Sequence, residues 1–117
     1  MKKALFALTP LLLTGMAFAD PQVEMVCSMV QQDDRNQMRR YLSDNRLNLR
    51  NIYDGIRCNN DTLLQFAMRN ESFEIGSFIV KQMRSGSLEQ AGYIEWANNN
   101  GLGHSPLVNE IRTRIGQ

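Results

Sequence analysis

Cys27 and Cys58, the two cysteines of the 117-residue sequence, are the first residues whose spacing bears on chemistry. A thiol redox motif places its cysteines two residues apart, and a zinc site needs more ligands than this pair and the lone His104. In an oxidising compartment an even pair is most simply a disulfide. The sequence therefore predicts a Cys27–Cys58 bridge, which would stabilise the fold by about 3–4 kcal/mol in the chain-entropy model.

Arginines are concentrated in the segment Arg35–Arg57, where only Asp44 and Asp54 oppose them. The forked donors of arginine suit phosphate, acidic sugars or the carboxylates of a partner. The alternative is a solvated helix face whose charges pair with the more acidic second half of the chain. The candidate contact residues for an anion are Arg39, Arg40, Arg46 and Arg50.

Tyr93 and Trp96 lie three residues apart beside an Asn- and Gly-rich loop at residues 98–103. Exposed, they would form a platform for a sugar, a peptide or a partner helix. Buried, they would complete the core against the last helix. His104 follows the loop and is a candidate surface ligand or pH-sensitive contact. The second candidate contact region is therefore Tyr93–His104.

The sequence lacks the constellations that common enzymes need. It contains no Gly-x-Ser-x-Gly elbow, no glycine-rich phosphate loop and no calcium-loop pattern at Asp33 and Asp34. His104 and Ser105 are adjacent, so their side chains are badly placed to form a dyad, and Ser105 is better explained as the cap before Pro106. We expect neither catalytic activity nor a cofactor or metal.

The chain begins MKKALFALTPLLLTGMAFAD, which has the order of a secretory signal peptide. Two lysines precede an apolar run, and Ala17-Phe18-Ala19 fits the small-x-small cleavage rule. The apolar run is shorter than the roughly 20 residues that span a bilayer. We therefore expect residues 1–19 to be removed and the product, which has no second apolar run, to reside in the periplasm.

Residues 20–117 are expected to form a single domain of nearly neutral charge. Removing Lys2 and Lys3 from the 13 basic residues leaves 11 against 12 acidic ones, a net charge of −1. A balance so close to zero argues against a general nucleic-acid binder. The partner classes that remain are a periplasmic protein or an anionic small ligand.

Helical periodicity extends over almost all of this domain. Helices are expected at 21–32, 34–45, 49–55 and 106–115. A helical hairpin is expected within Cys58–Met83, where Asp61 or Thr62 caps the first helix and the Ser72 hydroxyl caps the second. Ser85 and Gly86 are expected to form the loop that closes this hairpin. A helix from Leu88 is also indicated, although residues 93–97 alternate like a strand. The fold class is therefore all-α: a small bundle of five to six short helices, built from helical hairpins and stapled by one disulfide.

Shifting the sequence by 37 residues aligns the apolar positions of residues 26–42 with those of 63–79, which indicates two stacked helix-turn-helix units. Within the second unit, Thr62-Leu63-Leu64-Gln65-Phe66-Ala67 and the later Ile79-Val80 resemble an ankyrin repeat over residues 62–80. Leu63 and Gln65 stand where that repeat has proline and histidine. The pattern covers about one repeat, whereas at least three are usually needed for a stable stack.

The leader, a cysteine in the first helix and the later Cys58-Asn59-Asn60 with Phe66-Ala67 resemble a family of small exported bacterial proteins known only as a domain of unknown function. This resemblance covers most of residues 20–117 and implies no catalytic residue. By elimination, the sequence predicts a small periplasmic binding protein without catalytic activity. The alternative is an envelope stress or inhibitor protein that acts on a single partner enzyme.

Overall fold

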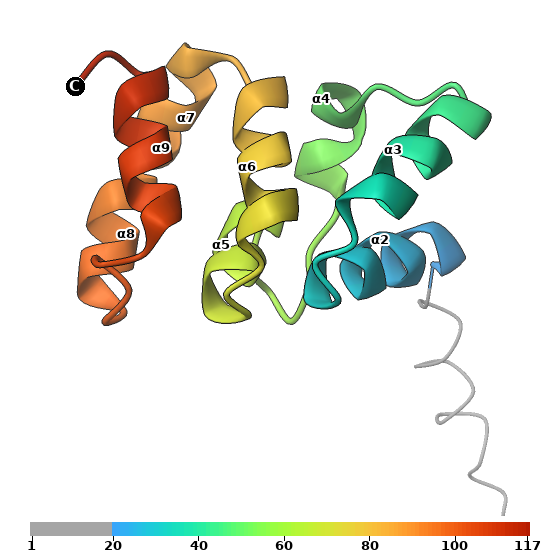
Figure 1. The fold of residues 1–117 in the computed structure, drawn as a ribbon, viewed down its shortest axis with the longest axis horizontal. Helices are drawn as coiled ribbons and strands as arrows, with labels where there is room; N and C mark the ends of the chain where they lie inside the picture. Colours follow the sequence, from blue (N-terminus) through green and yellow to red (C-terminus); the bar gives the residue numbers. More distant parts are fainter. Residues whose placement is uncertain (1–19) are drawn as a thin grey trace, which may run out of the picture.

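Residues 20–117 are described by the computed structural model, and they form eight α-helices and one short 3-10 helix (Figure 1). The predicted all-α fold is confirmed. The predicted signal peptide at 1–19 lies outside the described residues. The helices are α2 (Pro21–Gln31), α3 (Arg35–Asp44), α4 (Leu49–Ile52), η2 (Tyr53–Gly55), α5 (Leu63–Arg69), α6 (Phe73–Gln82), α7 (Ser85–Ala91), α8 (Tyr93–Asn99) and α9 (Pro106–Arg114).

Three helix pairs, α2–α3, α5–α6 and α8–α9, are stacked side by side. The first helices of the pairs form one layer, in which α5 contacts both α2 and α8. The second helices form the other layer, and Figure 1 shows α6 between α3 and α9. Each pair therefore buries its apolar faces against its neighbour, as in a solenoid. The short helices α4 and α7 lie near the ends of α3 and α6.

The first helix of each pair ends in the same type of turn, in which one residue has a left-handed backbone. These residues are Asp33 (φ 56°), Glu71 (φ 55°) and Gly101 (φ 74°). The amide that follows each of them donates to a carbonyl five residues earlier, as in a Schellman motif. Asp33 and Glu71 are 38 residues apart. The two predicted units are thus present, but their structural offset is 38 rather than 37.

The N-terminus of α6 is capped by the preceding helix pair. An oxygen of the Asp33 carboxylate accepts the Ile75 N–H at 2.8 Å. Ser72 occupies the N-cap position, but its hydroxyl makes no capping bond and is buried without a partner. The prediction that the Ser72 hydroxyl caps α6 is therefore wrong. A carboxylate from the first pair fixes the start of the second pair instead.

The buried apolar residues form one contiguous cluster that extends through all three helix pairs. Gly76 on α6 is part of this close packing, because a Cβ atom there would lie 2.5 Å from Leu107 Cδ1 on α9. Only glycine allows the two helices to approach so closely. The side chains that are 0% exposed include Val26, Met38, Leu63, Leu64, Ile75, Ile79, Leu107 and Ile111.

The segment after α6 differs from the prediction in two respects. Ser85 and Gly86 belong to α7 and do not form a loop that closes the hairpin. Gly92 has φ 68° and separates α7 from α8, so the single helix expected from Leu88 becomes two. Residues 93–97 lie within α8, which rules out the strand alternative.

Candidate functional site

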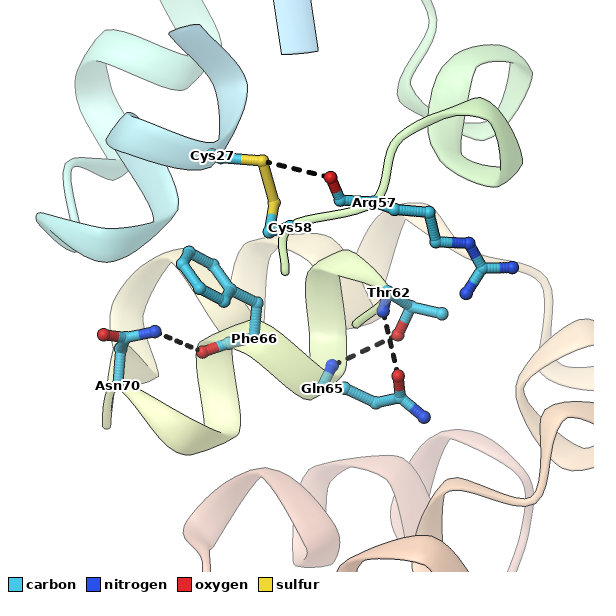
Figure 2. The surroundings of a disulfide bond; sticks show 7 residues. All are labelled: Cys27, Arg57, Cys58, Thr62, Gln65, Phe66 and Asn70. Atoms are coloured by element: carbon cyan, nitrogen blue, oxygen red, sulfur yellow. Dashed lines mark hydrogen bonds between the residues drawn. A yellow bond between two sulfur atoms is a disulfide. The ribbon is translucent and has the colours of Figure 1, made fainter. Parts of the chain in front are cut away.

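The predicted disulfide between Cys27 and Cys58 is present, with the two Cα atoms 5.7 Å apart (Figure 2). It joins the middle of α2 to the loop that leads into α5. The Arg57 carbonyl oxygen lies 3.8 Å from the Cys27 sulfur. This is a contact rather than a hydrogen bond, because a disulfide sulfur carries no proton. The bridge fixes the first helix pair to the entrance of the second.

A compact turn connects the disulfide to α5. The Cys58 and Asp61 amides each donate to the other residue's carbonyl, at 2.9 and 3.0 Å, across two asparagines with left-handed backbones. Asparagine tolerates that conformation better than most residues. Thr62 and Gln65 then form a capping box that starts α5 (Figure 2). Of the two residues expected to open this helix, Thr62 is the cap.

The four predicted arginines are all exposed, but the fold divides them into two pairs. Arg39 and Arg50 line a hollow of about 340 Å³ between α3, α4 and α6. We call it the leucine hollow, because Leu42, Leu47 and Leu49 also line it. Arg40 and Arg46 do not line it.

A second hollow of about 310 Å³ lies next to the first, and Arg50 lines both. We call it the tyrosine hollow, because the buried Tyr53 and Tyr93 line it. Arg84, the residue that precedes α7, also lines the tyrosine hollow, together with Asp54. The two hollows with Arg39, Arg50 and Arg84 form what we call the basic groove.

Arg84 is a groove arginine that the sequence does not indicate, because it lies in the more acidic second half of the chain. No local pattern relates it to Arg50, because 34 positions separate them in the sequence. The fold brings them to one hollow by placing the end of α6 beside α4. The sequence does not single out Tyr53 either, because a tyrosine at helical spacing is indistinguishable from an apolar core residue.

The hydroxyl oxygens of Tyr53 and Tyr93 lie 2.6 Å apart. The Tyr53 oxygen also accepts the Leu64 N–H at 3.2 Å, from the first turn of α5. Burial, and then the neighbouring Tyr93, raise the pKa of Tyr53 far above its usual range, so this hydroxyl keeps its proton. Tyr93 is only 3% exposed. Of the two alternatives for Tyr93, an exposed platform and burial in the core, the structure shows burial.

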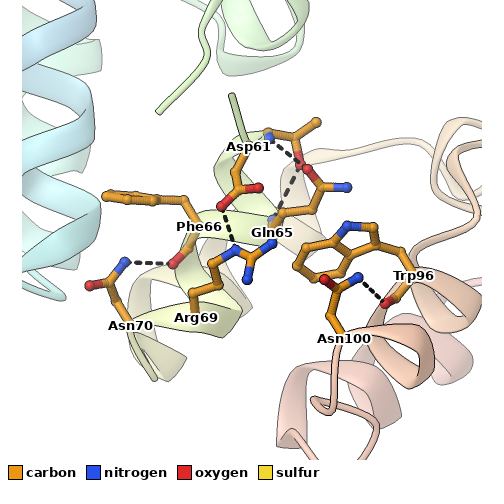
Figure 3. Close-up of polar contacts among 8 residues, drawn as sticks. Asp61, Gln65, Phe66, Arg69, Asn70, Trp96 and Asn100 are labelled. Carbon is orange, nitrogen blue, oxygen red and sulfur yellow. Dashed lines mark hydrogen bonds and ion pairs between the residues drawn. The ribbon is translucent and has the colours of Figure 1, made fainter. Parts of the chain in front are cut away.

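Trp96 is half-buried and packs against the core on a different side from the tyrosine hollow. The guanidinium carbon of Arg69 lies 5.0 Å from the centroid of its ring (Figure 3). Arg69 Nε also donates to Asp61 Oδ2 at 2.7 Å. His104 is exposed in the loop before α9 and lines neither hollow. The fold does not unite Tyr93, Trp96 and His104 in one site.

Residues 26–90, more than half of the chain, match the model of the family described as "Protein of unknown function (DUF3718)". The chain belongs to this family. The DUF3718 match begins in α2 and ends in α7, so it includes the disulfide and all three groove arginines. It stops before Tyr93, Trp96 and His104. No curated protein and no solved structure matches the chain.

In this DUF3718 protein, the charged and polar side chains that line the basic groove include arginines, tyrosines and one aspartate. Guanidinium groups and phenol hydroxyls can donate hydrogen bonds to an anion, whereas the Asp54 carboxylate can only accept them. In the part of the chain that the structure describes, no group of three or more His, Cys, Asp or Glu side chains could hold a metal ion. Among the same residues, no helix has the length and apolar character needed to cross a membrane.

Proposed function

We propose that this chain is an exported, non-catalytic binding protein of the periplasm that holds an anionic ligand in the basic groove. The observation that carries the proposal is the position of Arg50, which lines both hollows, the leucine hollow with Arg39 and the tyrosine hollow with Arg84. Three guanidinium groups with one opposing carboxylate, Asp54, give the groove a net positive charge. A surface of this kind attracts and orients carboxylates or phosphates.

Export is supported by the basic and apolar leader and by the disulfide. Disulfides persist in oxidising compartments such as the periplasm and are rare in the cytosol. Expression of the full chain in a bacterium, followed by fractionation and N-terminal sequencing, tests this part. We expect a periplasmic product that begins at Asp20. A product that keeps Met1 and stays in the cytosol would contradict the proposal.

The stacked helix pairs also support a role in binding. Repeat proteins with stacked helix pairs present extended surfaces to their partners, and the ankyrin-like pattern at 62–80 belongs to one such pair. Residues of all three pairs, from α3, α6 and α8, line the groove, and α4 and α7 add to the surface. We therefore propose that the pairs serve as a rigid scaffold and that the groove is the contact surface.

Native mass spectrometry and in-cell crosslinking of the exported protein test the binding role. The groove variant R50A/R84A removes two guanidiniums from the tyrosine hollow. The matched control R40A/R46N also removes two, and Asn is chosen because Arg46 has φ 53°, which Asn tolerates. We expect an anionic ligand to be retained by the wild type and the control and lost from the groove variant.

Equal retention by both variants, or none by the wild type, would overturn the binding role. A one-to-one complex with a single enzyme through the groove would instead support the inhibitor alternative. Circular dichroism should show that both variants keep their helical content, because all four arginines are exposed and none contributes to the core.

A further inference from the structure

The hydroxyls at the tyrosine hollow hold one proton more than their mutual hydrogen bonds require. Tyr53 and Tyr93 carry two hydroxyl protons, and the 2.6 Å contact between them uses one. The Leu64 N–H is a donor to Tyr53, so it takes up no proton. The Thr62 hydroxyl also interacts with Tyr53, but it brings its own proton and leaves the count unchanged. One hydroxyl proton is therefore not used by the hydrogen bonds among these groups and must point away from them.

An acceptor in the tyrosine hollow would decide which of the two tyrosine hydroxyls donates to the other. If Tyr53 donates to Tyr93, the Tyr93 proton is free for an acceptor in the hollow that both residues line. The hydrogen bonds then run from Leu64 N–H through Tyr53 to Tyr93, and each polarises the next. A negatively charged oxygen is the acceptor that strengthens such a chain most.

The charged groups around the hollow match a single negative charge. Arg50 and Arg84 contribute two positive charges and Asp54 one negative charge, and all three are exposed at its rim. A net charge of +1 suits a carboxylate better than a doubly charged phosphate. Asp54 can accept a hydrogen bond only from a ligand that also carries a donor.

We infer that the tyrosine hollow binds a small organic acid with one carboxylate and a neighbouring hydroxyl or ammonium group. The carboxylate lies between Arg50 and Arg84 and accepts the Tyr93 hydroxyl proton, and the hydroxyl or ammonium group donates to Asp54. The volume of about 310 Å³ is at the small end of ligand sites and suits a molecule of this size. This inference rests on the proposed function, and it narrows the ligand class at one end of the basic groove.

NMR titration of the disulfide-bonded protein, residues 20–117, tests the inference. The probes are lactate, glycerate and serine, with propionate as the matched acid that has neither hydroxyl nor ammonium group. We expect at least one of the first three to bind at millimolar concentration and propionate to bind several-fold more weakly. The Leu64 amide resonance should shift on binding although Leu64 does not line the hollow, because it donates to the hydroxyl chain.

Three variants separate this site from general charge effects. Y93F keeps the ring and removes the donor, so we expect about a tenfold weaker affinity and loss of the Leu64 shift. R50A/R84A should abolish binding, and R40A/R46N should leave it unchanged. The inference is overturned if none of the three acids binds, if propionate binds as well, if phosphate binds more tightly, or if Y93F binds like the wild type. An anionic ligand still retained in cells through Arg50 and Arg84 would then leave the proposed function intact.

Discussion

The Arg69 guanidinium stacks over the ring of Trp96 at 5.0 Å, and this contact joins the second helix pair to the third. Arg69 is held in place by Asp61, which pairs with Cys58 next to the disulfide. These contacts therefore link the disulfide turn to α8, which lies outside the matched family region. Trp96 is the single tryptophan of the chain and reports on this link by its fluorescence.

Replacing Arg69 by alanine removes both the ion pair and the stacking on Trp96. Because the Arg69 side chain is 46% exposed, we expect the free energy of unfolding to fall by only about 1 kcal/mol. The tryptophan emission should shift in the folded protein. Urea unfolding followed by fluorescence measures both effects. The exposed R40A is the control and should change neither.

Reduction of the Cys27–Cys58 bridge, or the variant C27S/C58S, should lower the free energy of unfolding by about 3–4 kcal/mol. Without the bridge, the unfolded chain between the two cysteines has a higher conformational entropy, which favours unfolding. Thermal unfolding with and without reductant measures the loss. Purified protein with two titratable thiols and the same melting temperature in reductant would contradict this prediction.

The Asp33 carboxylate should contribute more to stability than the Ser72 hydroxyl, although Ser72 holds the N-cap position of α6. D33G keeps the left-handed backbone and removes the cap, so we expect a loss of about 1 kcal/mol and faster exchange of the Ile75 amide. S72A removes a buried hydroxyl without a partner and should be neutral or stabilising by up to about 1 kcal/mol. Hydrogen exchange and urea unfolding compare the two. A larger loss for S72A than for D33G would refute the assignment.

Gly76→Ala should destabilise the protein by about 1–3 kcal/mol, because the new methyl group meets Leu107 Cδ1 at 2.5 Å. Gly86→Ala is the matched control within α7, where a Cβ meets nothing within 4 Å. It should stabilise the protein by about 0.5–1 kcal/mol through helix propensity. Thermal unfolding of the two variants tests the sign of each change. Equal effects would show that α6 and α9 can move apart.

Alkaline pH should destabilise the fold through Tyr53. Burial raises the pKa of Tyr53 in the folded state, whereas in the unfolded chain it is near 10. Above about pH 10 the unfolded state therefore loses this proton while the folded state keeps it, and stability falls by up to about 1.4 kcal/mol per pH unit. Urea midpoints measured from pH 8 upward give the slope. We expect the variant Y53F to reduce this dependence of stability on pH and the control variant Y41F to leave it unchanged.

Local rules accounted for much of the helical architecture. Asp20 with Pro21, Asp34, Thr62, and Ser105 with Pro106 cap helices as their side chains predict, because a cap depends on neighbouring residues alone. The disulfide followed from the small number of cysteines. These features need no knowledge of tertiary contacts.

Contacts between distant segments could not be read from the sequence. Arg84 lines the same hollow as Arg50 only because α6 ends beside α4. The Tyr93 hydroxyl is buried against Tyr53, which lies 40 positions earlier. Asp33 replaces Ser72 as the cap of α6 for the same reason, since 42 positions separate Asp33 from Ile75. The basic groove forms where the helix pairs stack on one another, whereas the hydrophobic periodicity of the sequence describes each helix separately.

The disulfide closes residues 27–58 into a covalent ring that contains Arg39 and Arg50 but not Arg84. The lining residues 50–54 of the tyrosine hollow therefore lie inside the ring, whereas the lining residues 83–93 lie outside it. A single proteolytic cut between Asp54 and Cys58 would leave residues 50–54 attached to the rest of the molecule through the disulfide. In a reducing medium the same cut would release them, and ligand affinity would then depend on the redox state.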